Sequence, residues 1–397
     1  MAEAAREAWI TGIGIVSCLG EGPEAHWQGL MSAPPEPDTT TFAPFIVHRL
    51  PPIDFDKQIP KRGDQRQMEP WQSIGTYAAG LALDSAALKG RMDRLARMDM
   101  VVAAGAGERD LAVDTAVLAG MPQASSRAAF LNERLMNDLR PTLFLAQLSN
   151  LLAGNISIVH GVTGSSRTFM GEESAGIDAV RIALSRILAG QSDIALVGGA
   201  QNGERKDQLL IYEFGGCNLK GSFAPVWERK AHPGFAFGSI GAFLVLESRD
   251  HAQARGATPV ARLSAVVSDR CNRQPGAATQ SLERLWAKLG PAVTPAQAAV
   301  ISGACGTEPA TADERAFLEQ HPDLAVRATG THLGHGLEPR FPMNVALAAL
   351  SVQHGRLFPP CGATSFEQPT DRALKQAVVT GVGHWRGEGM ALVEAVP

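Results

Sequence analysis

Short apolar segments that end in glycine-rich turns recur along the whole chain, and helix-like patterns lie between them. The clearest segments are MDMVVAAGAG at Met98–Gly107 and SDIALVGG at Ser192–Gly199. An apolar run of this length, bounded by turns, is typical of a strand that is buried on both faces of a sheet. Strands that alternate with helices through short connections indicate the α/β class, and we predict that class here.

The two parts of the chain show a similar order of elements, without a repeat at the level of residues. The first part runs from the strand pattern WITGIGIVS at Trp9–Ser17 to GSIGAFLVLE at Gly238–Glu247, and a polar stretch follows it. Beyond that stretch, strand, glycine turn and helix alternate again. A length of 397 residues fits two to three ordinary domains or one large duplicated domain. We therefore predict two halves, residues 1–248 and 249–397.

The composition argues against several classes of protein. Hydrophobic residues make up 45% of the chain, and the net charge of −4 comes with no long basic run, so no nucleic-acid surface is expected. No apolar run reaches membrane-spanning length, and the start MAEAAREAW is too polar for a signal peptide. The five cysteines are scattered and form no CxxC pair, so we expect reduced thiols and a cytoplasmic protein.

Several motifs for cofactors and metals are missing. Gly12-Ile13-Gly14 and Gly105-Ala106-Gly107 lack the third glycine of a dinucleotide fingerprint, and we interpret both as structural turns. His332 and His335 lie three residues apart in HLGH, but no further ligand cluster accompanies them in the sequence, which favours turn chemistry over a zinc site. We expect neither a bound metal nor a cofactor.

Two adjacent glutamates, Glu172 and Glu173, precede an apolar helix pattern that is established from Ala175 onwards. The first N–H groups of a helix lack intrahelical partners, and the helix dipole is positive at this end, so carboxylates are favourable there. Helix capping is the simplest interpretation of the pair.

Several blocks of the sequence resemble, in order and spacing, the β-ketoacyl-acyl-carrier-protein synthases. The resemblance covers the chain from Trp9 to Glu394. It implies a thiolase-like duplicated fold of five layers, α/β/α/β/α, that forms dimers. The blocks are WITGIGIVSCLG, SNLLAGNISIVHGVTG, GQSDIALVGGA, HPGFAFGSIGAFLVLES, GACGTEP, RATGTHLG and VVTGVGHWRGEGMALVE.

The catalytic groups that the resemblance implies are largely replaced. The family's cysteine nucleophile falls on Glu173, its first histidine on Cys305 and its second on His332. The lysine that usually stands five residues before the second histidine falls on Arg327, and the phenylalanine gate of the C-terminal glycine-rich motif falls on Val382. A carboxylate is a far weaker nucleophile towards a thioester than a thiolate, and S–H is a weak donor to an enolate. We expect that this chain cannot perform Claisen condensation alone.

The stretch GEESAGIDA is similar, without a gap, to the corresponding stretch of chain-length factors, usually Thr-Glu-Gln-Ala-Gly-Gly-Leu-Asp-Ala. Those proteins resemble ketosynthases without the cysteine. The likeness implies a subunit that pairs with an active ketosynthase and shapes the acyl-chain tunnel of a type II synthase. Its product would be a polyketide or a polyene, and the departures from aromatic-polyketide factors favour an aryl polyene.

The same resemblance implies partners and surfaces. An acyl carrier protein would bring the substrate on its phosphopantetheine, which the active ketosynthase would mainly bind. In this family the extended segment before the nucleophile helix, here Ser165–Gly171, pairs across the dimer. Candidate tunnel residues are Phe130, Leu131, Leu135 and Met136.

Alternative functions stay open at this point. Glu173 and His332 could form an acid/base pair for malonyl decarboxylation, dehydration or cyclisation, provided that burial keeps Glu173 protonated. An ionised Glu173 would instead repel the malonate carboxylate and the enolate formed from it. A pair of Cys305 and His332 could also serve acyl transfer or hydrolysis, although relics of a vestigial pocket are the favoured interpretation. Finally, the chain could be a scaffolding homodimer without a tunnel.

Overall fold

The computed structural model describes residues 6–140, 143, 147–361 and 366–396. Most of its strands form one hydrogen-bonded path in the order β11-β10-β12-β13-β9-β1-β8-β6-β4-β5, and the short strand β2 pairs with β1. Strands β3 and β7 pair separately. The strands are β1 Ala8–Ser17, β2 Gly20–Glu21, β3 Val47–His48, β4 Asp99–Ala103, β5 Ser166–Phe169, β6 Ile194–Gln201, β7 Phe237–Gly238, β8 Ile240–Ser248, β9 Ala261–Asp269, β10 Ala298–Ser302, β11 Ala325–Ala328, β12 Gln376–Val382 and β13 Glu388–Glu394.

The two halves of this path repeat one arrangement. The first half pairs as β5-β4-β6-β8-β1 and the second as β11-β10-β12-β13-β9, which is the same order when the strands are numbered within each half. In both halves the three strands at the outer end are parallel and the remaining pairings are antiparallel. A short antiparallel contact between β1 and β9 joins the halves. The expected division at residues 248 and 249 falls between β8 and β9, and it stays a prediction.

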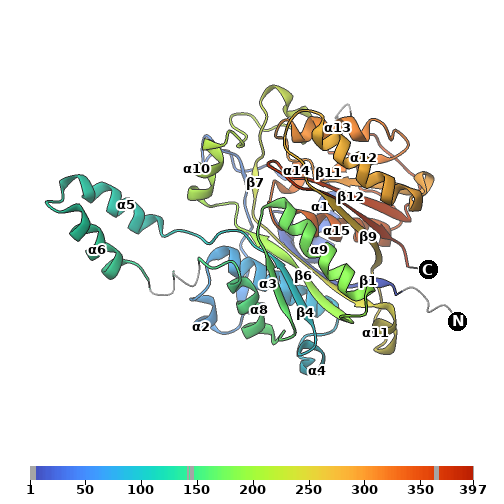
Figure 1. Ribbon diagram of the computed structural model, residues 1–397, viewed down its shortest axis with the longest axis horizontal. Helices are drawn as coiled ribbons and strands as arrows, with labels where there is room; N and C mark the ends of the chain where they lie inside the picture. Colours follow the sequence, from blue (N-terminus) through green and yellow to red (C-terminus); the bar gives the residue numbers. More distant parts are fainter. Residues whose placement is uncertain (1–5, 141–142, 144–146, 362–365, 397) are drawn as a thin grey trace.

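Helices lie outside and between the two halves of the sheet path (Figure 1). Helices α3 and α8 pack on the first half, α12 and α13 on the second, and α9 and α15 contact strands of both halves. This is the layering α/β/α/β/α that the resemblance to ketosynthases implies. No helix in the described ranges is long and apolar enough to cross a membrane. The helices are α1 Gly22–Leu30, α2 Arg62–Gln65, α3 Pro70–Ser85, α4 Met92–Leu95, α5 Leu111–Gly120, α6 Arg127–Asp138, α8 Leu151–His160, α9 Glu173–Leu188, α10 Lys206–Phe214, α11 Arg249–Ala254, α12 Ala277–Leu289, α13 Ala310–Leu318, α14 Gly330–Leu333 and α15 Arg340–Gln353.

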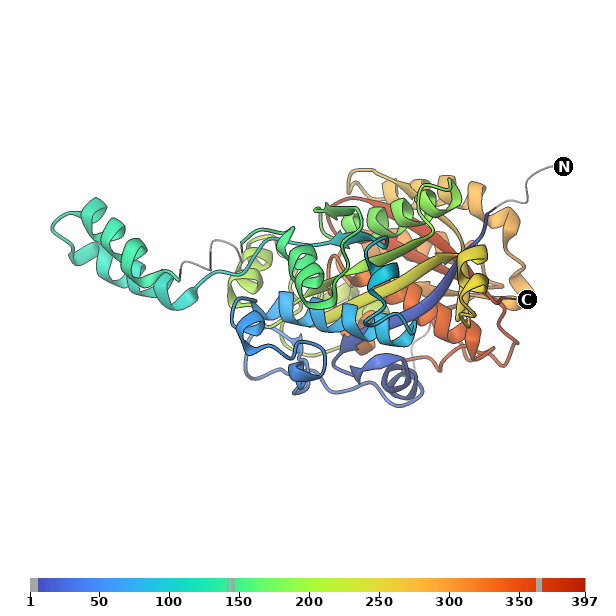
Figure 2. The same ribbon diagram turned by 90° about the horizontal axis from the view of Figure 1, so that it is seen from below.

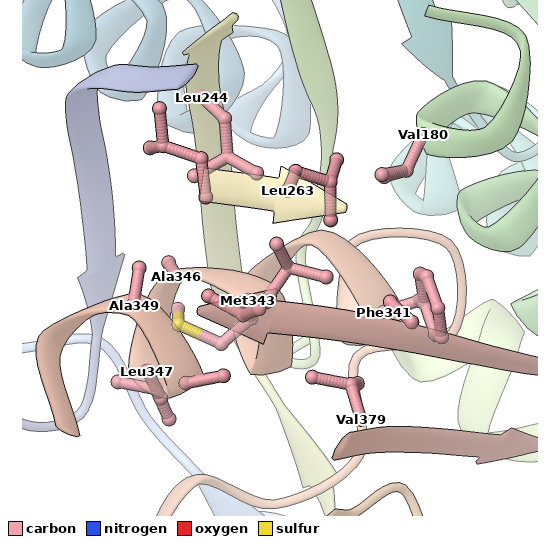
Figure 3. Close-up of a cluster of buried hydrophobic side chains, with 14 of the residues drawn as sticks. Val180, Leu244, Leu263, Phe341, Met343, Ala346, Leu347, Ala349 and Val379 are labelled. Carbon is pink, nitrogen blue, oxygen red and sulfur yellow. The ribbon is translucent and has the colours of Figure 1, made fainter. Parts of the chain in front are cut away.

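The middle layer is buried on every side. Every residue of α15 from Arg340 to Val352 is buried, and most of them are small or aliphatic. A helix that is apolar all round is stable only inside the protein, where each face meets other apolar side chains. Figure 3 shows this packing, with Met343 of α15 between Leu244 of β8 and Val379 of β12. The layer fixes the start of α9, and with it the position of Glu173.

Glycines in β1 allow α3 to pack against the strand backbone. A Cβ atom at Gly14 would lie 2.0 Å from the carbonyl oxygen of Ala78, and one at Gly12 would lie 2.4 Å from that of Ala82. No side chain fits at either position. The expectation of a turn at Gly12–Gly14 is therefore wrong, because both residues lie inside β1 and are required by close packing of a helix.

A helical hairpin of α5 and α6 projects from the body of the protein in both views (Figures 1 and 2). No residue of α6 is buried, and Leu118 and Met136 are 72% and 74% exposed. The two helices contact each other where the ring of Phe130 covers Gly120. The hairpin thus leaves large apolar side chains without cover from the described part of its own chain.

Candidate functional site

The two adjacent glutamates stand at a strained turn between β5 and α9. Gly171 and Glu172 both have positive φ, +133° and +58°, and Glu173 is the first residue of α9. A non-glycine residue in this region of backbone space costs roughly 1–3 kcal/mol and persists only where its surroundings enforce it. The turn directs Glu173 into the protein, where it is only 4% exposed.

The Glu173 carboxylate is held by two histidines from distant parts of the chain. His335 Nε2 lies 2.8 Å from Glu173 Oε1. His384 Nδ1 lies 2.9 Å from Oε1 and 3.1 Å from Oε2, and the His384 backbone N–H donates to Oε1 at 3.2 Å. His335 follows α14, and His384 lies in the loop between β12 and β13. We call these three residues the Glu173 cluster.

The cluster is an internal ion pair. Burial raises the pKa of the Glu173 carboxyl, but the charge of His384 and the hydrogen bonds from both histidines outweigh burial and hold that pKa well below its usual range. Burial lowers the pKa of His384, but the charge of Glu173 outweighs it and leaves the pKa raised. For His335, burial prevails and the pKa is lowered. The favoured state is an ionised Glu173 between a cationic His384 and a neutral His335.

The same three residues offer a donor set for a metal ion. One ligand atom from each of Glu173, His335 and His384 lies within 4.8 Å of the others. A metal-binding histidine normally donates its second ring N–H to an acceptor, which fixes the ring. Nδ1 of His335 is buried and has no hydrogen-bond partner among the described residues. The site therefore fits a hydrogen-bonded ion pair better than a metal centre.

Of the residues that the sequence pattern assigned to this site, Cys305 lies close by. It is buried, and its Sγ lies 3.0 Å from Oγ1 of Thr307. Burial raises the pKa of the Cys305 thiol, and the negative charge of Glu173 adds to the rise. A thiol with a raised pKa stays protonated, so Cys305 is not poised as a nucleophile.

The structure brings His335, and not His332, to Glu173. The His332 ring is buried near Phe358, and no hydrogen bond or ion pair joins it to Glu173 in the described part of the chain. Burial, with the charge of Arg327 in addition, lowers the pKa of His332 to about 4. Arg327 itself is buried on β11 and donates to the carbonyl oxygen of Phe358 at 2.7 Å.

The backbone after α14 explains why His335, and not the expected His332, reaches Glu173. Helix α14 ends at Leu333, and Gly334 then turns the chain with φ +72°. His335 continues as extended backbone beside Phe237, with its N–H donating to the carbonyl oxygen of Ala236 at 2.7 Å. The side chain of His335 thereby reaches Glu173. The signal in the sequence was the pair HLGH, but the family motif that TGTHLG resembles selected the first histidine.

In the C-terminal glycine-rich motif, too, the residue that reaches Glu173 differs from the one that the motif indicated. Val382 is the last residue of β12 and is buried among Val378 and Met390 in the core of the second half. His384, two residues further on, reaches Glu173 and lines a surface pocket. The geometry thus assigns the position facing the site to His384, whereas the motif pattern pointed to Val382.

The proposed tunnel residues lie away from the Glu173 cluster in this chain. Phe130, Leu131, Leu135 and Met136 belong to α6, which has no buried residue. The hairpin that carries them projects from the body (Figure 2). A role of these side chains in a tunnel therefore requires a second chain and stays a prediction.

A surface pocket of about 380 Å³ adjoins the Glu173 cluster, and we call it the Trp385 pocket. Met170, Ile211 and Trp385 line its outer part and are 64%, 61% and 65% exposed. Its polar lining includes Glu172, Tyr212, Glu338 and His384.

Within this pocket, the Tyr212 and His384 rings meet edge to face, with their centroids 5.3 Å apart. The pocket thus has an apolar rim, and its polar lining includes His384, which belongs to the buried ion pair. The arrangement can hold an apolar chain beside Glu173. It offers no activated thiol with which to form a thioester.

Comparison with known proteins adds a family to this geometry. The model for the beta-ketoacyl synthase N-terminal domain matches residues 5–252. The chain is 25% identical over 264 residues to 3-oxoacyl-[acyl-carrier-protein] synthase 2 of Vibrio cholerae and 25% identical over 270 residues to that of Vibrio harveyi. These matches cover 64% and 65% of this chain but only 60% and 61% of the relatives, so the chain matches less than two thirds of their length.

Solved structures match the whole fold at low sequence identity. The ishigamide ketosynthase/chain length factor superposes with a TM-score of 0.79 at 19% identity, over 99% of this chain and 100% of that one. A beta-ketoacyl synthase from Burkholderia phymatum STM815 gives 0.78 at 16% identity, with the same coverage.

A third structure, of a type II polyketide synthase acyl carrier protein in complex with its ketosynthase, gives 0.75 at 16%, also over 99% and 100%. The fold is thus the thiolase-like fold of ketosynthases. The family model covers more than half of the chain, and the chain belongs to the β-ketoacyl synthase family.

Proposed function

We propose that this chain is a non-condensing subunit, similar to a chain-length factor, that pairs with an active ketosynthase in a type II synthase. Its role is to complete the dimer and to shape the space into which the growing acyl chain extends. The partner supplies the cysteine nucleophile and the histidines, and an acyl carrier protein brings the substrate on its phosphopantetheine. A conjugated polyene of the aryl polyene type is the favoured product class.

The observation that carries this proposal is the Glu173 cluster. Glu173 stands at the start of α9, where the resemblance predicts a cysteine. Hydrogen bonds with His335 and His384 hold its carboxylate in place. An ionised carboxylate that is held by these hydrogen bonds cannot accept an acyl group from a thioester at a useful rate. Cys305 is a protonated, buried thiol without an assigned base, so it does not replace the lost nucleophile.

Two surfaces of the chain support a dimer. Strand β5 ends the sheet path and pairs only with β4 among the described strands, so its outer edge is open for a strand of another chain. The α5–α6 hairpin exposes Leu118 and Met136, and apolar patches of this kind are typical of protein interfaces. The names of the similar structures, a ketosynthase/chain length factor and a ketosynthase with its carrier protein, also favour such an assembly.

Co-expression with an intact ketosynthase from the same genome tests the proposal. We expect a heterodimer by native mass spectrometry, and we expect products of a defined length from malonyl-carrier protein only when both chains are present. The matched control is the complex with Glu319→Ala, which changes an exposed glutamate on the second half. Condensation by this chain alone, without the partner, would refute the proposal.

One alternative has a specific observation in its favour. His384 contacts Glu173 and also lines the Trp385 pocket, so the pair could act as an acid and base on a bound malonyl group. In that case the chain alone would release carbon dioxide from malonyl-carrier protein. Both Glu173→Ala and His384→Ala would abolish the release, while Glu319→Ala would not. We expect no release, because the ionised Glu173 repels the malonate carboxylate.

A further inference from the structure

We propose that the Trp385 pocket binds the far end of an apolar acyl chain that carries a hydroxyl group, and that Glu338 is the residue that recognises this hydroxyl. The inference deepens the proposed function, on which it rests for the nature of the chain that enters. It assigns a specificity-determining role to a residue outside the Glu173 cluster.

Glu338 combines deep burial with an unused hydrogen-bonding atom. The residue is 3% exposed and lines the pocket. Its Oε2 atom is buried and has no hydrogen-bond partner among the described residues. Buried polar atoms in native proteins are nearly always paired, so an orphaned carboxyl oxygen at a pocket indicates a partner that enters from outside.

Arg205, a cationic residue of the pocket that could pair with Glu338, already has other hydrogen-bond partners. The Arg205 guanidinium also lines the pocket, but it donates to the carbonyl oxygens of Ala106 and Gly107 at 2.9 and 2.8 Å and to Asp207 at 2.7 Å. These bonds hold Arg205 on the loop after β4. The described bonds of Arg205 therefore do not include Glu338.

The surroundings of Glu338 favour a neutral carboxyl group. Burial raises its pKa to about 7, and the charges of Glu173 and Glu172 add to the rise. A neutral carboxyl can both donate to and accept from a hydroxyl, whereas a second anion near Glu173 and Glu172 would be repelled. The chemistry at this point of the pocket thus matches an uncharged hydroxyl better than a carboxylate or a phosphate.

The remainder of the pocket matches an apolar chain. Met170, Ile211 and Trp385 form its exposed part and contribute a thioether, an aliphatic side chain and an indole. A backbone glycine, Gly105, leaves room for the Glu338 carboxyl, since a Cβ atom there would lie 2.9 Å from Oε1. A chain that enters past the apolar rim would bring its end to Glu338.

A matched pair of ligands tests this assignment. Methyl 8-hydroxyoctanoate and methyl octanoate differ by one terminal hydroxyl, and their binding to the full chain is measured by calorimetry at pH 6, in whichever assembly the chain purifies. We expect the hydroxy ester to bind about tenfold more tightly, which is the effect of one buried hydrogen bond. The readout is independent of condensation and of a ketosynthase partner, so its failure is separable from failure of the proposed function.

Variants of Glu338 give the control for this measurement. Glu338→Leu should remove the preference by weakening the hydroxy ester alone, and Glu338→Gln, which keeps a donor and an acceptor, should retain most of it. Circular dichroism checks that each variant is folded, and Glu338→Ala replaces the leucine variant if that one is not. Equal binding of both esters, no binding of either, or a preference that survives in the folded leucine or alanine variant would overturn the assignment.

Discussion

Two buried carboxylates, Glu338 in the lining of the Trp385 pocket and Glu173 behind the pocket residue His384, have opposite electrostatic states. Both are almost fully inaccessible, and burial raises the pKa of each. Glu173 meets His384 and His335, which reverse the effect of burial and keep the group ionised. Glu338 lacks a partner for Oε2 among the described residues, and its pKa rises to about 7.

The difference shows that burial alone does not decide the charge of a carboxyl group. Desolvation disfavours the ionised form at both positions, and the presence or absence of a cationic hydrogen-bond donor then decides the outcome. The ionised Glu173 also adds to the raised pKa of Glu338, so the two sites are coupled. The ionised state of Glu173 and the raised pKa of Glu338 thus follow from one distribution of histidines.

The largest effect is expected when Glu173 is made neutral. Glu173→Gln removes the charge that keeps the buried His384 protonated, so the ion pair and its charge-assisted hydrogen bonds are lost. At about 1.5–3 kcal/mol for each of these bonds, we expect a loss of about 3–5 kcal/mol in the free energy of unfolding at pH 6. Urea unfolding at a fixed protein concentration measures it. Glu338→Gln, the same change at the other carboxyl, should cost less than about 1 kcal/mol at this pH. Equal losses at both positions would remove the distinction between the two sites.

The second effect is a dependence of stability on pH. Because the folded pKa of Glu338 is raised from 4.5 to about 7, its contribution is complete below pH 4.5 and is lost as the pH rises through 7. At about 1.4 kcal/mol per pKa unit, the wild-type chain should lose roughly 3 kcal/mol between pH 5 and pH 8 that Glu338→Gln does not lose. Parallel unfolding curves of the two proteins give the difference, with Glu319→Gln as the control. Identical pH profiles would contradict a raised pKa.

The third effect is the coupling between Glu173 and His384. The lowered pKa of Glu173 stabilises the fold fully above pH 4.5, and this contribution is lost as the pH falls from 4.5 through the lower pKa of the folded state. The raised pKa of His384 stabilises the fold fully below pH 6.5, and this contribution is lost as the pH rises from 6.5 through the higher pKa of the folded state. A double-mutant cycle with Glu173→Gln and His384→Asn should give a coupling on the order of 2 kcal/mol, largest between about pH 4.5 and 6.5. A cycle of Glu319→Gln with His384→Asn should give none. Coupling that is constant from pH 4 to 9 would argue against an ion pair.

The smallest effect concerns the turn that aims Glu173 inward. Glu172 has φ +58°, a conformation that glycine adopts without strain. Glu172→Gly should therefore raise the free energy of unfolding by about 1 kcal/mol, the relief of strain less the added freedom of the unfolded chain. Glu172→Ala removes the same carboxylate but keeps the strain, and it should give no gain. If both variants change stability alike, the carboxylate and not the backbone is responsible.

Much of the fold could be predicted from the sequence. Strands β4 and β6 contain the apolar runs MVVA and IALV, each followed within two residues by a glycine, and this pattern depends only on local composition. The α/β class and the five-layered ketosynthase fold are confirmed. The glycines of β1 were misjudged because close packing against α3 and a tight turn both select glycine, and the sequence does not distinguish them.

The candidate site was predictable only in part. Position by position, the motifs pointed to Glu173 at the start of a buried helix, and the structure has it there. The partners of Glu173 could not be predicted from the sequence, because a turn at Gly334 and a loop after β12 bring them to the carboxylate. The family motifs favoured His332 and Val382, which are buried and make no hydrogen bond to the carboxylate among the described residues.

By itself, the sequence determined the alternation of strands and helices and the presence of a carboxylate at the start of an apolar helix, because both are properties of local pattern and residue type. Only the tertiary structure decided that His335 and His384 converge on Glu173 and that Glu338 faces a pocket without an internal partner. The charge of a buried group depends on its neighbours within a few ångströms, and these come from segments that are distant in the chain.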